Sequence, residues 1–318
     1  MKDEELKIGD WSRQIAAFQS NLQRPTSNIK LNEPLARYTT SRVGGPAEAL
    51  IEVTSAAELT DVVIAARQAG LPILMLGGGA NVLISDAGVR GLTIINKAKR
   101  LSFRDDGAVW CETGMALPTL ARECVARGLG GLEWAVGVPG TVGGAVVGNA
   151  GAHGRDIAAD LVSATILNSA NEVVEWSNAE LNFGYRTSRI KSEVRSQKSE
   201  VVALAATFQL APGNPAESAA RAADFNDYRR RTQPSGASMG SMFKNPPALT
   251  AGRLIDQCGL KGTRIGGAEI STVHANFCVN RGAATAIDVQ ALIDLARTKV
   301  RERFGIELEL EVELVGEW

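Results

Sequence analysis

Two glycine-rich tracts are the parts of this sequence best suited to chemistry. The first is Gly77-Gly78-Gly79-Ala80-Asn81, and the second runs from Gly137 to Ala145 and continues to Asn149-Ala150-Gly151. Glycine lets a backbone approach a phosphate closely, and successive N–H groups can form an anion-binding nest. The first tract is not a P-loop, because no Gly-Lys-Ser/Thr follows it, and it is not a Rossmann fingerprint, because no Gly-x-Gly-x-x-Gly opens a helix.

Each tract on its own is also consistent with an ordinary glycine turn. Two such loops, both apolar and nearly uncharged, together favour one long ligand that crosses both. A dinucleotide with a buried ring system meets that demand. A pair of unrelated tight turns is the alternative.

A β-α-β unit is expected to position the first tract. Ala49 to Val53 is an apolar run of strand length, and Ser55 with Glu58 has the spacing of a capping box. Apolar residues then repeat at helical spacing up to Gly70, which is typical of a helix end. Ile73 to Leu76 predicts a buried strand that leads directly into the glycines.

Strands and helices alternate through the rest of the chain, which indicates an α+β fold. The last segment alternates strictly, with Leu308 to Leu314 apolar on one face and Glu307 to Glu313 acidic on the other, and predicts an extended strand. Residues 211–217 are the best linker candidate, and residues 232–248 are expected to form a loop. Further strands are predicted at 92–95, 108–112, 162–167, 172–176, 201–210 and 276–279, and helices at 119–127, before 231 and around 289–300.

The composition is that of an ordinary globular protein and excludes several classes. Hydrophobic residues make up 45% and charged residues 22%, with a net charge of -1. We therefore expect no nucleic-acid or membrane partner. No apolar run of about 18 residues predicts a membrane span, and the acidic start lacks the apolar segment of a secretory signal. The four cysteines lack metal-ligand spacing and three of them stand in apolar stretches, so we predict buried free thiols in a reducing compartment, the cytoplasm, and no metal site.

A series of short motifs resembles the UDP-N-acetylenolpyruvoylglucosamine reductases, the MurB family. The resemblance covers nearly the whole chain after about residue 30, and the motifs stand in the family's order. They are Tyr38-Thr39-Thr40, Gly44-Gly45-Pro46-Ala47, the tract from Leu76 to Leu83, Pro139 to Ala145, Asn149-Ala150-Gly151, Phe183-Gly184-Tyr185-Arg186-Thr187-Ser188, Gly240 to Pro246, Ala251-Gly252-x-Leu254-Ile255, Gly259 to Gly262, His274-Ala275-Asn276-Phe277 and Leu310-Glu311-Val312.

The resemblance implies a fold with an FAD-binding module of the vanillyl-alcohol-oxidase (PCMH) type. It has two α+β subdomains and is followed by a C-terminal α+β substrate-binding domain. The expected boundaries are a loose N-terminal arm over 1–30 and a module over 31–210, divided into about 31–96 and 97–210. A substrate-binding domain over 218–306 and a C-terminal strand over 307–318, which returns to the active site, complete the chain.

The resemblance also implies non-covalent FAD and NADPH as co-substrate. The expected reaction reduces UDP-N-acetyl-3-O-(1-carboxyvinyl)glucosamine to UDP-N-acetylmuramate, a peptidoglycan precursor. We expect a monomer. The residues expected to contact FAD are Gly77, Gly78, Gly79, Ala80, Asn81, Val82, Pro139, Gly140, Thr141, Gly143, Gly144, Asn149 and Gly151.

Three residues at distant positions receive chemical roles from the resemblance. Arg186 is expected to hold the substrate carboxylate, Ser241 to donate a proton, and Glu311 to serve as the carboxyl partner at the reacting carbon. A fixed guanidinium stabilises negative charge as it forms on a carboxylate. A carboxyl group kept protonated by burial can share that load, and a hydroxyl can deliver the final proton.

Pattern alone does not select these residues. Without the motifs, Arg186 reads as part of a solvated basic turn, Ser241 as one of several loop serines, and Glu311 as a solvent-facing strand glutamate. The substrate-binding residues are expected to include Tyr185, Lys244, Asn245 and His274. For His274 and Asn276, a buried hydrogen-bonded pair is an equal alternative. Lys244, Asn245 or any of Arg229, Arg230 and Arg231 could bind the diphosphate of the substrate. The three arginines are also typical of a helix C-terminus.

The chain departs from the family pattern at two positions. Ala80 stands where serine is common, which puts one hydroxyl contact to FAD in doubt, and His153 stands where tyrosine is common. No insertion follows Tyr185-Arg186, so the chain resembles the shorter, second subgroup. Two rival functions remain open, an FAD oxidase of a small alcohol or sugar and a non-enzymatic flavin-binding or nucleotide-sugar-binding protein.

Overall fold

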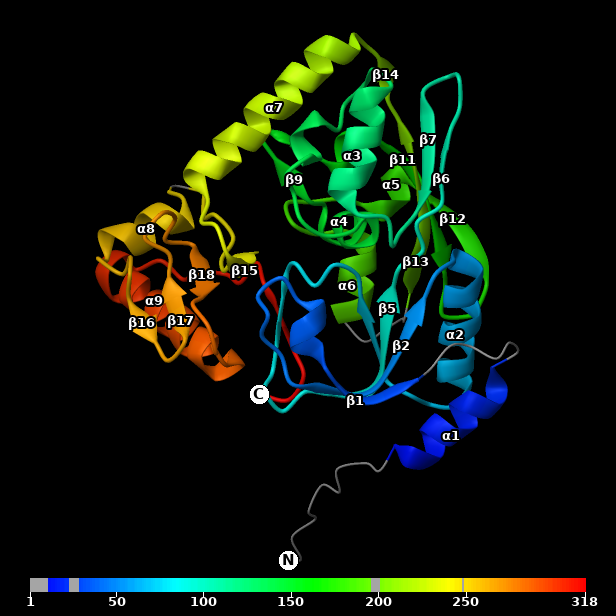
Figure 1. Ribbon diagram of the computed structural model, residues 1–318, viewed down its shortest axis with the longest axis horizontal. Helices are drawn as coiled ribbons and strands as arrows, with labels where there is room; N and C mark the ends of the chain where they lie inside the picture. Colours follow the sequence, from blue (N-terminus) through cyan, green and yellow to red (C-terminus); the bar gives the residue numbers. More distant parts are fainter. Residues whose placement is uncertain (1–10, 23–28, 196–200, 248) are drawn as a thin grey trace, which may run out of the picture.

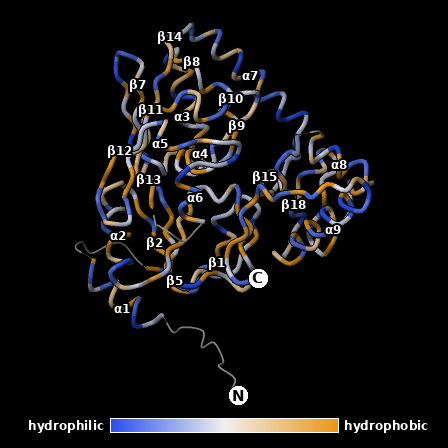
Figure 2. Tube along the Cα trace, turned by 180° about the vertical axis from the view of Figure 1, so that it is seen from behind, coloured by the Kyte–Doolittle hydropathy of each residue, from blue (hydrophilic) through white to orange (hydrophobic). Residues whose placement is uncertain are grey.

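A computed structural model describes residues 11–22, 29–195, 201–247 and 249–318. Figure 1 shows two lobes, a larger one formed by the N-terminal two-thirds of the chain and a smaller C-terminal one, with the long helix α7 (Pro215–Thr232) leading from one to the other. Apolar residues concentrate in the strands of the larger lobe, whereas α7 is largely hydrophilic (Figure 2). No helix within the described ranges is both long and apolar enough to cross a membrane.

The first part of the chain forms a four-stranded sheet in the order β1-β2-β5-β3. Helix α2 (Ala56–Gln68) connects β2 to β3, and both strands pair in parallel with β5. The Ser55 side chain accepts from the Glu58 N–H at 3.2 Å, and Gly70 has a φ of 67°, so the predicted start and end of this helix are confirmed. The strands are β1 (Lys30–Pro34), β2 (Pro46–Val53), β3 (Ile73–Leu76) and β5 (Val89–Asn96).

The prediction of a loose arm over residues 1–30 is wrong for residues 12–21, which form a helix. Helix α1 (Ser12–Asn21) packs against α2, with Ile15 and Phe18 in the same apolar cluster as Leu59 and Val62. Phe18 is fully buried, so two apolar side chains one turn apart outweigh the polar composition of this segment. Residues 1–10 and 23–28, which the prediction also covered, lie outside the described residues.

The second part is a five-stranded sheet in the order β12-β11-β13-β7-β6. Its core includes the fully buried Phe208 and the nearly fully buried Trp134, with helix α3 (Leu117–Ala126) packed in the same cluster. The strands are β6 (Leu101–Phe103), β7 (Ala108–Glu112), β11 (Leu161–Leu167), β12 (Val173–Ser177) and β13 (Val202–Gln209). Shorter elements are β8 (Leu129–Gly130), β9 (Gly151–Ala152), β10 (Arg155–Asp156), β14 (Ala211–Pro212), α4 (Val142–Gly148), α5 (Asn178–Leu181) and α6 (Arg189–Arg195).

The third part is a sheet in the order β15-β18-β17-β16, covered by α8 (Ala251–Gln257) and α9 (Ala286–Phe304). The expected loop over 232–248 contains β15 (Ala237–Ser241), because this segment pairs antiparallel with β18 (Phe277–Asn280). Ser241 therefore lies on a strand rather than in a flexible loop. The remaining strands are β16 (Arg264–Ile265) and β17 (Ala268–Ile270).

The C-terminal segment is extended but only partly a strand. Strand β19 (Glu313–Val315) pairs in parallel with β4 (Val82–Ile84), which directly follows the first glycine tract. Before it, Leu310 forms an isolated bridge with Phe243 of the third part. The predicted continuous strand over 307–318 is thus broken, because the segment changes partners as it passes from one lobe to the other. Leu308 and Val312 are buried as predicted, whereas Leu314 is exposed.

Hydrogen bonds fix the lobes against each other. The Asp86 carboxylate accepts from Ala286 N (2.8 Å) and Ile287 N (3.1 Å) at the start of α9. The Thr40 hydroxyl donates to Ser238 O at 2.7 Å. The predicted linker over 211–217 is shorter than expected, since β14 pairs with β8 and α7 already begins at Pro215.

The four cysteines are free thiols. Cys111, Cys124 and Cys278 are buried as predicted, and burial raises the pKa of the Cys124 and Cys278 thiols to about 12. Cys258 is only partly covered. Within the described ranges, no cluster of His, Cys, Asp and Glu side chains is arranged to hold a metal ion.

Candidate active site

The two glycine tracts lie against each other. A β-carbon built on Gly78 would stand 3.0 Å from Gly140 Cα, and one on Gly77 would stand 2.3 Å from the Thr141 hydroxyl oxygen. At Gly79, where φ is 58°, the added carbon would be 2.0 Å from Tyr38 O. Side chains at Gly77 and Gly78 would push the two tracts apart, and one at Gly79 would clash with the Tyr38 backbone. Tertiary contact therefore requires glycine at all three positions, and backbone conformation favours it at Gly79 as well.

The second tract leaves backbone facing open space beside this contact. A β-carbon at Gly144 would meet only the Thr141 hydroxyl, at 3.9 Å, and one at Gly140 would meet only Ala80, at 3.6 Å. Bare backbone of this kind in the second tract, next to the first tract, suits the close approach of a dinucleotide's phosphates. The residues present therefore fit an FAD-type cofactor.

Arg186 lies in a two-residue turn closed by paired backbone hydrogen bonds between Gly184 and Thr187. Its φ of 57° places a non-glycine residue in the left-handed region, a strained conformation that clusters at functional sites. The guanidinium donates to Gly151 O at 3.0 Å and to Asn149 O at 3.5 Å, both at the end of the second glycine tract. The turn thus holds the guanidinium beside the predicted cofactor site.

Glu311 forms an ion pair with Arg186. Its Oε1 lies 2.7 Å from Arg186 Nε, and the two side chains are 17% and 24% exposed. Burial raises the pKa of the Glu311 carboxyl, although Arg186, Lys191 and Lys244 all act to lower it. A carboxyl group with a raised pKa holds its proton to a higher pH than in water, which suits a hydrogen-bond donor to a developing negative charge.

Ser241 lies next to this pair along two backbones. Met242, the following residue, accepts from the Glu311 N–H at 2.9 Å through its carbonyl oxygen. On the other side, a β-carbon on Gly240 would lie 3.8 Å from Ala80 O in the first glycine tract. The Ser241 hydroxyl hydrogen bonds with no residue that the structure describes, so it is available to a ligand. The three predicted catalytic residues are thus brought together beside both tracts.

Asn81 and Asn149 have structural roles that their expected contacts with FAD did not include. The side-chain amide of Asn81 donates to Glu311 O at 3.0 Å, and the backbone carbonyl of Asn81 accepts from Glu313 N at 3.0 Å. The Asn149 side chain is buried and bonds Asp156, Gly184 O and Ala158 N. Asn81 therefore positions Glu311, and Asn149 ties the second tract to the Arg186 turn; the Asn149 side chain is already occupied by protein.

The four expected substrate contacts divide into two groups. Asn245 N donates to the Tyr185 hydroxyl at 3.4 Å, and Lys244 forms an ion pair with Glu309, so these three residues lie near Arg186. His274 instead packs against α8, where a β-carbon on Gly252 would lie 2.8 Å from its ring. Its Nδ1 accepts from Asn276 N at 3.3 Å, and burial, followed by Lys261, lowers its pKa. No described contact joins His274 to the Arg186–Glu311 pair.

Asn276 is a positioning residue that the sequence left ambiguous. Its side chain is buried, donates to Phe243 O at 2.7 Å and accepts from Phe243 N at 3.0 Å. These bonds fix the segment that carries Ser241. The alternative of a buried, hydrogen-bonded Asn276 is therefore the one that the structure supports.

The three consecutive arginines of α7 differ in their surroundings. Arg230 pairs with Asp227 at 3.5 Å, and Arg231 donates to Asp227 O at 3.4 Å. Arg229 packs against Gly137, where an added β-carbon would lie 2.9 Å from Arg229 Cδ, and burial lowers its pKa. Among the described residues, its guanidinium has no hydrogen-bond or ion-pair partner.

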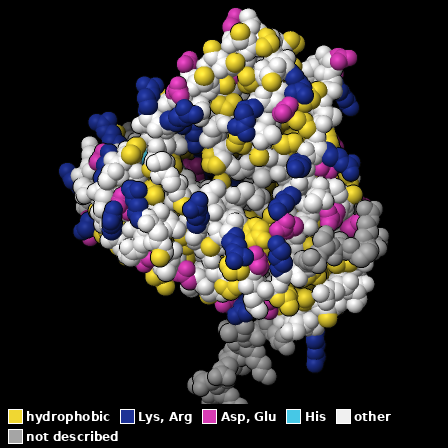
Figure 3. All heavy atoms as spheres, in the orientation of Figure 1, with side chains coloured by type: hydrophobic (Ala, Val, Ile, Leu, Met, Phe, Trp, Pro, Cys, Tyr) yellow, Lys and Arg dark blue, Asp and Glu magenta, His cyan; other side chains and the backbone are white. Residues whose placement is uncertain are grey.

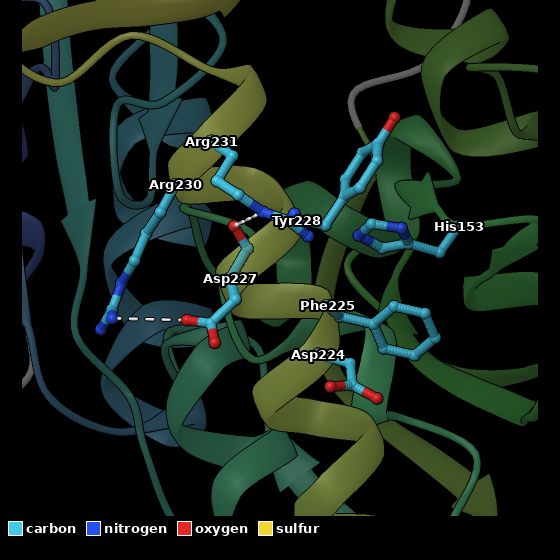
Figure 4. Close-up of a pocket in the computed structure, with 7 residues that line it drawn as sticks. All are labelled: His153, Asp224, Phe225, Asp227, Tyr228, Arg230 and Arg231. Carbon is cyan, nitrogen blue, oxygen red and sulfur yellow. Dashed lines mark hydrogen bonds and ion pairs between the residues drawn. The ribbon is translucent and has the colours of Figure 1, made fainter.

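A hollow of about 610 Å³ lies beside this part of α7. Figure 4 shows His153 between Phe225 and Tyr228, with ring centroids 4.3 Å and 5.4 Å away. Burial, followed by the charge of Arg229, lowers the pKa of His153. On the face shown in Figure 3, basic and acidic side chains are interspersed over α7 and the C-terminal lobe.

Comparisons with known proteins agree with this geometry. A family model described as "FAD binding domain" matches residues 47–177, and one described as "UDP-N-acetylenolpyruvoylglucosamine reductase, C-terminal domain" matches residues 232–315. UDP-N-acetylenolpyruvoylglucosamine reductase of Rubrobacter xylanophilus is 45% identical over 297 residues, covering 93% of this chain and 98% of the relative. The protein of the same name from Chloroflexus aurantiacus is 44% identical over 287 residues, covering 89% and 96%.

The fold is matched by a solved structure as well. The crystal structure of the reductase (MurB) from Thermus caldophilus aligns with a TM-score of 0.77 and 35% identity, over 91% of this chain and 99% of that one. The matches to relatives span nearly the full length of this chain and of each relative. The glycine tracts lie within residues 47–177 and Glu311 within residues 232–315, the ranges that the two family models match. The chain belongs to the UDP-N-acetylenolpyruvoylglucosamine reductase family.

Proposed function

We propose that this protein uses FAD and NADPH to reduce UDP-N-acetyl-3-O-(1-carboxyvinyl)glucosamine to UDP-N-acetylmuramate for peptidoglycan synthesis. The observation that carries the proposal is the Arg186–Glu311 pair, 2.7 Å apart, with Ser241 adjacent and both glycine tracts beside it. These groups come from three separate parts of the chain and meet at one place. We further propose that the protein acts as a monomer in the cytoplasm, with an FAD-binding module over 31–210 and a substrate-binding domain over 218–306.

The chemistry requires a protein group that stabilises the negative charge that develops on the substrate carboxylate. FAD, which the two glycine tracts would hold, would supply the hydride that NADPH provides for the β-carbon of the enol ether. Negative charge then develops at the α-carbon and spreads into the adjacent carboxylate. Arg186 is permanently charged and already oriented by Gly151 O, so it can stabilise that charge with little reorganisation. Glu311, whose pKa burial raises, lies against the same guanidinium and would donate a hydrogen bond to these oxygens in its protonated form.

The final proton is assigned to Ser241. A serine hydroxyl is a weak acid in water, so it serves only a strongly basic carbanion at close range. The hydroxyl of Ser241 is free of protein partners in the described residues, and the neighbouring Met242 carbonyl is held by Glu311 N. This arrangement supports proton delivery at the position where the α-carbon carbanion forms.

For the UDP diphosphate, Arg229 is the preferred basic residue, since Lys244 already pairs with Glu309. Arg229 is half-buried without a protein counter-ion in the described residues, and leaving a buried guanidinium unpaired is costly. An anionic ligand would remove that cost. Arg230 and Arg231 already bond to Asp227 and are therefore less suited.

An anaerobic half-reaction assay tests the proposed function. NADPH should bleach the yellow protein, and the enolpyruvyl sugar should restore its colour. In Ser241→Ala, bleaching should persist while recovery slows by at least about a hundredfold, the scale of a lost general acid. Ser238→Ala, on the same strand, is the matched control and should recover normally. Unchanged recovery in Ser241→Ala would remove this serine from the mechanism, and failure of the native protein to recover would reject the function.

A further inference from the structure

Lys191 is a buried lysine that the proposed chemistry does not use. It lies on α6, five residues after Arg186, and only 8% of the residue is exposed. Its Nζ lies 2.7 Å from Glu313 Oε1 and donates to Arg186 O at 3.2 Å. One ammonium group therefore contacts both the residue that carries the guanidinium and the segment that carries the catalytic carboxyl.

The segment from Glu311 to Glu313 is held from three directions. Met242 O accepts from Glu311 N at 2.9 Å, and Asn81 bonds Glu311 O and Glu313 N, both at 3.0 Å. These contacts come from the C-terminal lobe and from the first part of the chain. Lys191 adds a contact from the second part, to which Arg186 belongs, so it links the backbone of the Arg186 turn to the side chain of Glu313.

A buried ammonium group is retained only if its partners compensate for lost hydration. Here the partners are a carboxylate and the carbonyl of a residue with a φ of 57°. That strained turn persists only if its surroundings hold it in place. The Lys191 ammonium group fixes the backbone carbonyl of Arg186. The hydrogen bonds to Gly151 O and Asn149 O fix the guanidinium of the same residue.

We propose that Lys191 is a positioning residue for reduction of the enolpyruvyl sugar. By holding Arg186 O and the Glu313 carboxylate together, it sets the Arg186 guanidinium and the Glu311 carboxyl at the spacing that receives the substrate carboxylate. The proposal rests on the proposed function of this site. A misplacement of about 1 Å at a reacting group can cost about a hundredfold in rate, so a remote clamp of this kind has a measurable effect.

The test compares two half-reactions of FAD-loaded Lys191→Met, a substitution that keeps the length of the side chain and removes the donor. Flavin reduction by NADPH should stay within about threefold of native, because it does not need the carboxylate site. Reoxidation by the enolpyruvyl sugar should slow by about thirtyfold to a hundredfold. The affinity for UDP-N-acetylmuramate, measured by calorimetry, should fall about tenfold. Lys299→Met, which removes an exposed lysine paired with Glu302, is the matched control and should change none of these values.

Glu313→Met provides a second variant that removes the other end of the clamp at a partly exposed position. It should show the same selective slowing of reoxidation, by about tenfold, and it decides the question if Lys191→Met does not retain FAD. A proportional loss in both half-reactions would show a general structural role and overturn the proposal. Reoxidation within threefold of native in a variant that retains FAD would overturn it too. Absence of sugar-driven reoxidation in the native protein would instead reject the proposed function.

Discussion

The contact between the two glycine tracts can be tested with one added methyl group. In Gly78→Ala, the new β-carbon would lie 3.0 Å from Gly140 Cα, closer than the ordinary carbon–carbon contact of about 3.5–4.0 Å. Gly78 does not have a positive φ, so alanine adds no backbone strain there. The tracts must separate by about 0.5–1 Å, and overpacking of this size costs about 1–3 kcal/mol.

The cost should appear as weaker FAD binding rather than as global unfolding, because the tracts can separate when no cofactor spans them. A loss of 1–3 kcal/mol corresponds to a dissociation constant about 5 to 150 times larger. Titration of FAD into the apoprotein, followed by flavin fluorescence, measures this change directly. Thermal unfolding of the same apoprotein separates it from a general loss of stability.

Gly213→Ala is the matched control for this experiment. Gly213 lies outside both tracts and has no positive φ, and a β-carbon built there would make only ordinary contacts, 3.5 Å from Gly128 O and 3.9 Å from the Ser218 hydroxyl oxygen. Its FAD affinity should be native. Native FAD affinity in Gly78→Ala would refute the reasoning that FAD requires the two tracts in contact.

Three further predictions follow from individual contacts. Asp86→Ala should lower the free energy of unfolding by about 1 kcal/mol, because it removes the acceptor for Ala286 N at the start of α9. Urea unfolding measures the change, and an unchanged unfolding midpoint would contradict the prediction. Glu311 has a raised pKa in the folded protein, so the free energy of unfolding should fall as pH rises from about 4.5 through that higher pKa. Glu311→Gln should flatten this pH dependence, measured by urea unfolding at several pH values. Parallel pH dependences in the native protein and the variant would contradict the prediction. Arg229→Met should weaken binding of UDP-N-acetylmuramate about tenfold or more in calorimetry, with Arg230→Met nearly unchanged; equal effects would contradict the assignment of the diphosphate to Arg229.

Local sequence features predicted much of the first part of the fold. The Ser55 cap, the helical spacing after it and Gly70 at its end depend on contacts within a few residues, and the structure confirms all three. The order of motifs likewise indicated the family, which the comparisons confirm. Helix α1 was missed because its apolar face is only Ile15 and Phe18, and α2, against which it packs, is not visible in the local pattern.

The active-site pairing lies beyond any local signal. Glu309, Glu311 and Glu313 are equivalent in the alternating C-terminal pattern, yet Glu311 pairs with Arg186, Glu313 with Lys191 and Glu309 with Lys244. The choice depends on where the segment crosses between lobes, which long-range bonds to Asn81 and Met242 determine.

The sequence by itself determined the β-α-β unit of the first part, the family and the residue types that its chemistry needs. Only the tertiary structure decided that Asn81 and Lys191 hold the site together and that His274 lies apart from it. The physical reason is that caps, turns and amphipathic faces arise from neighbours along the chain. Residues up to about 230 positions away along the chain determine instead which groups are buried. They also determine the pKa and the partner of each charged group.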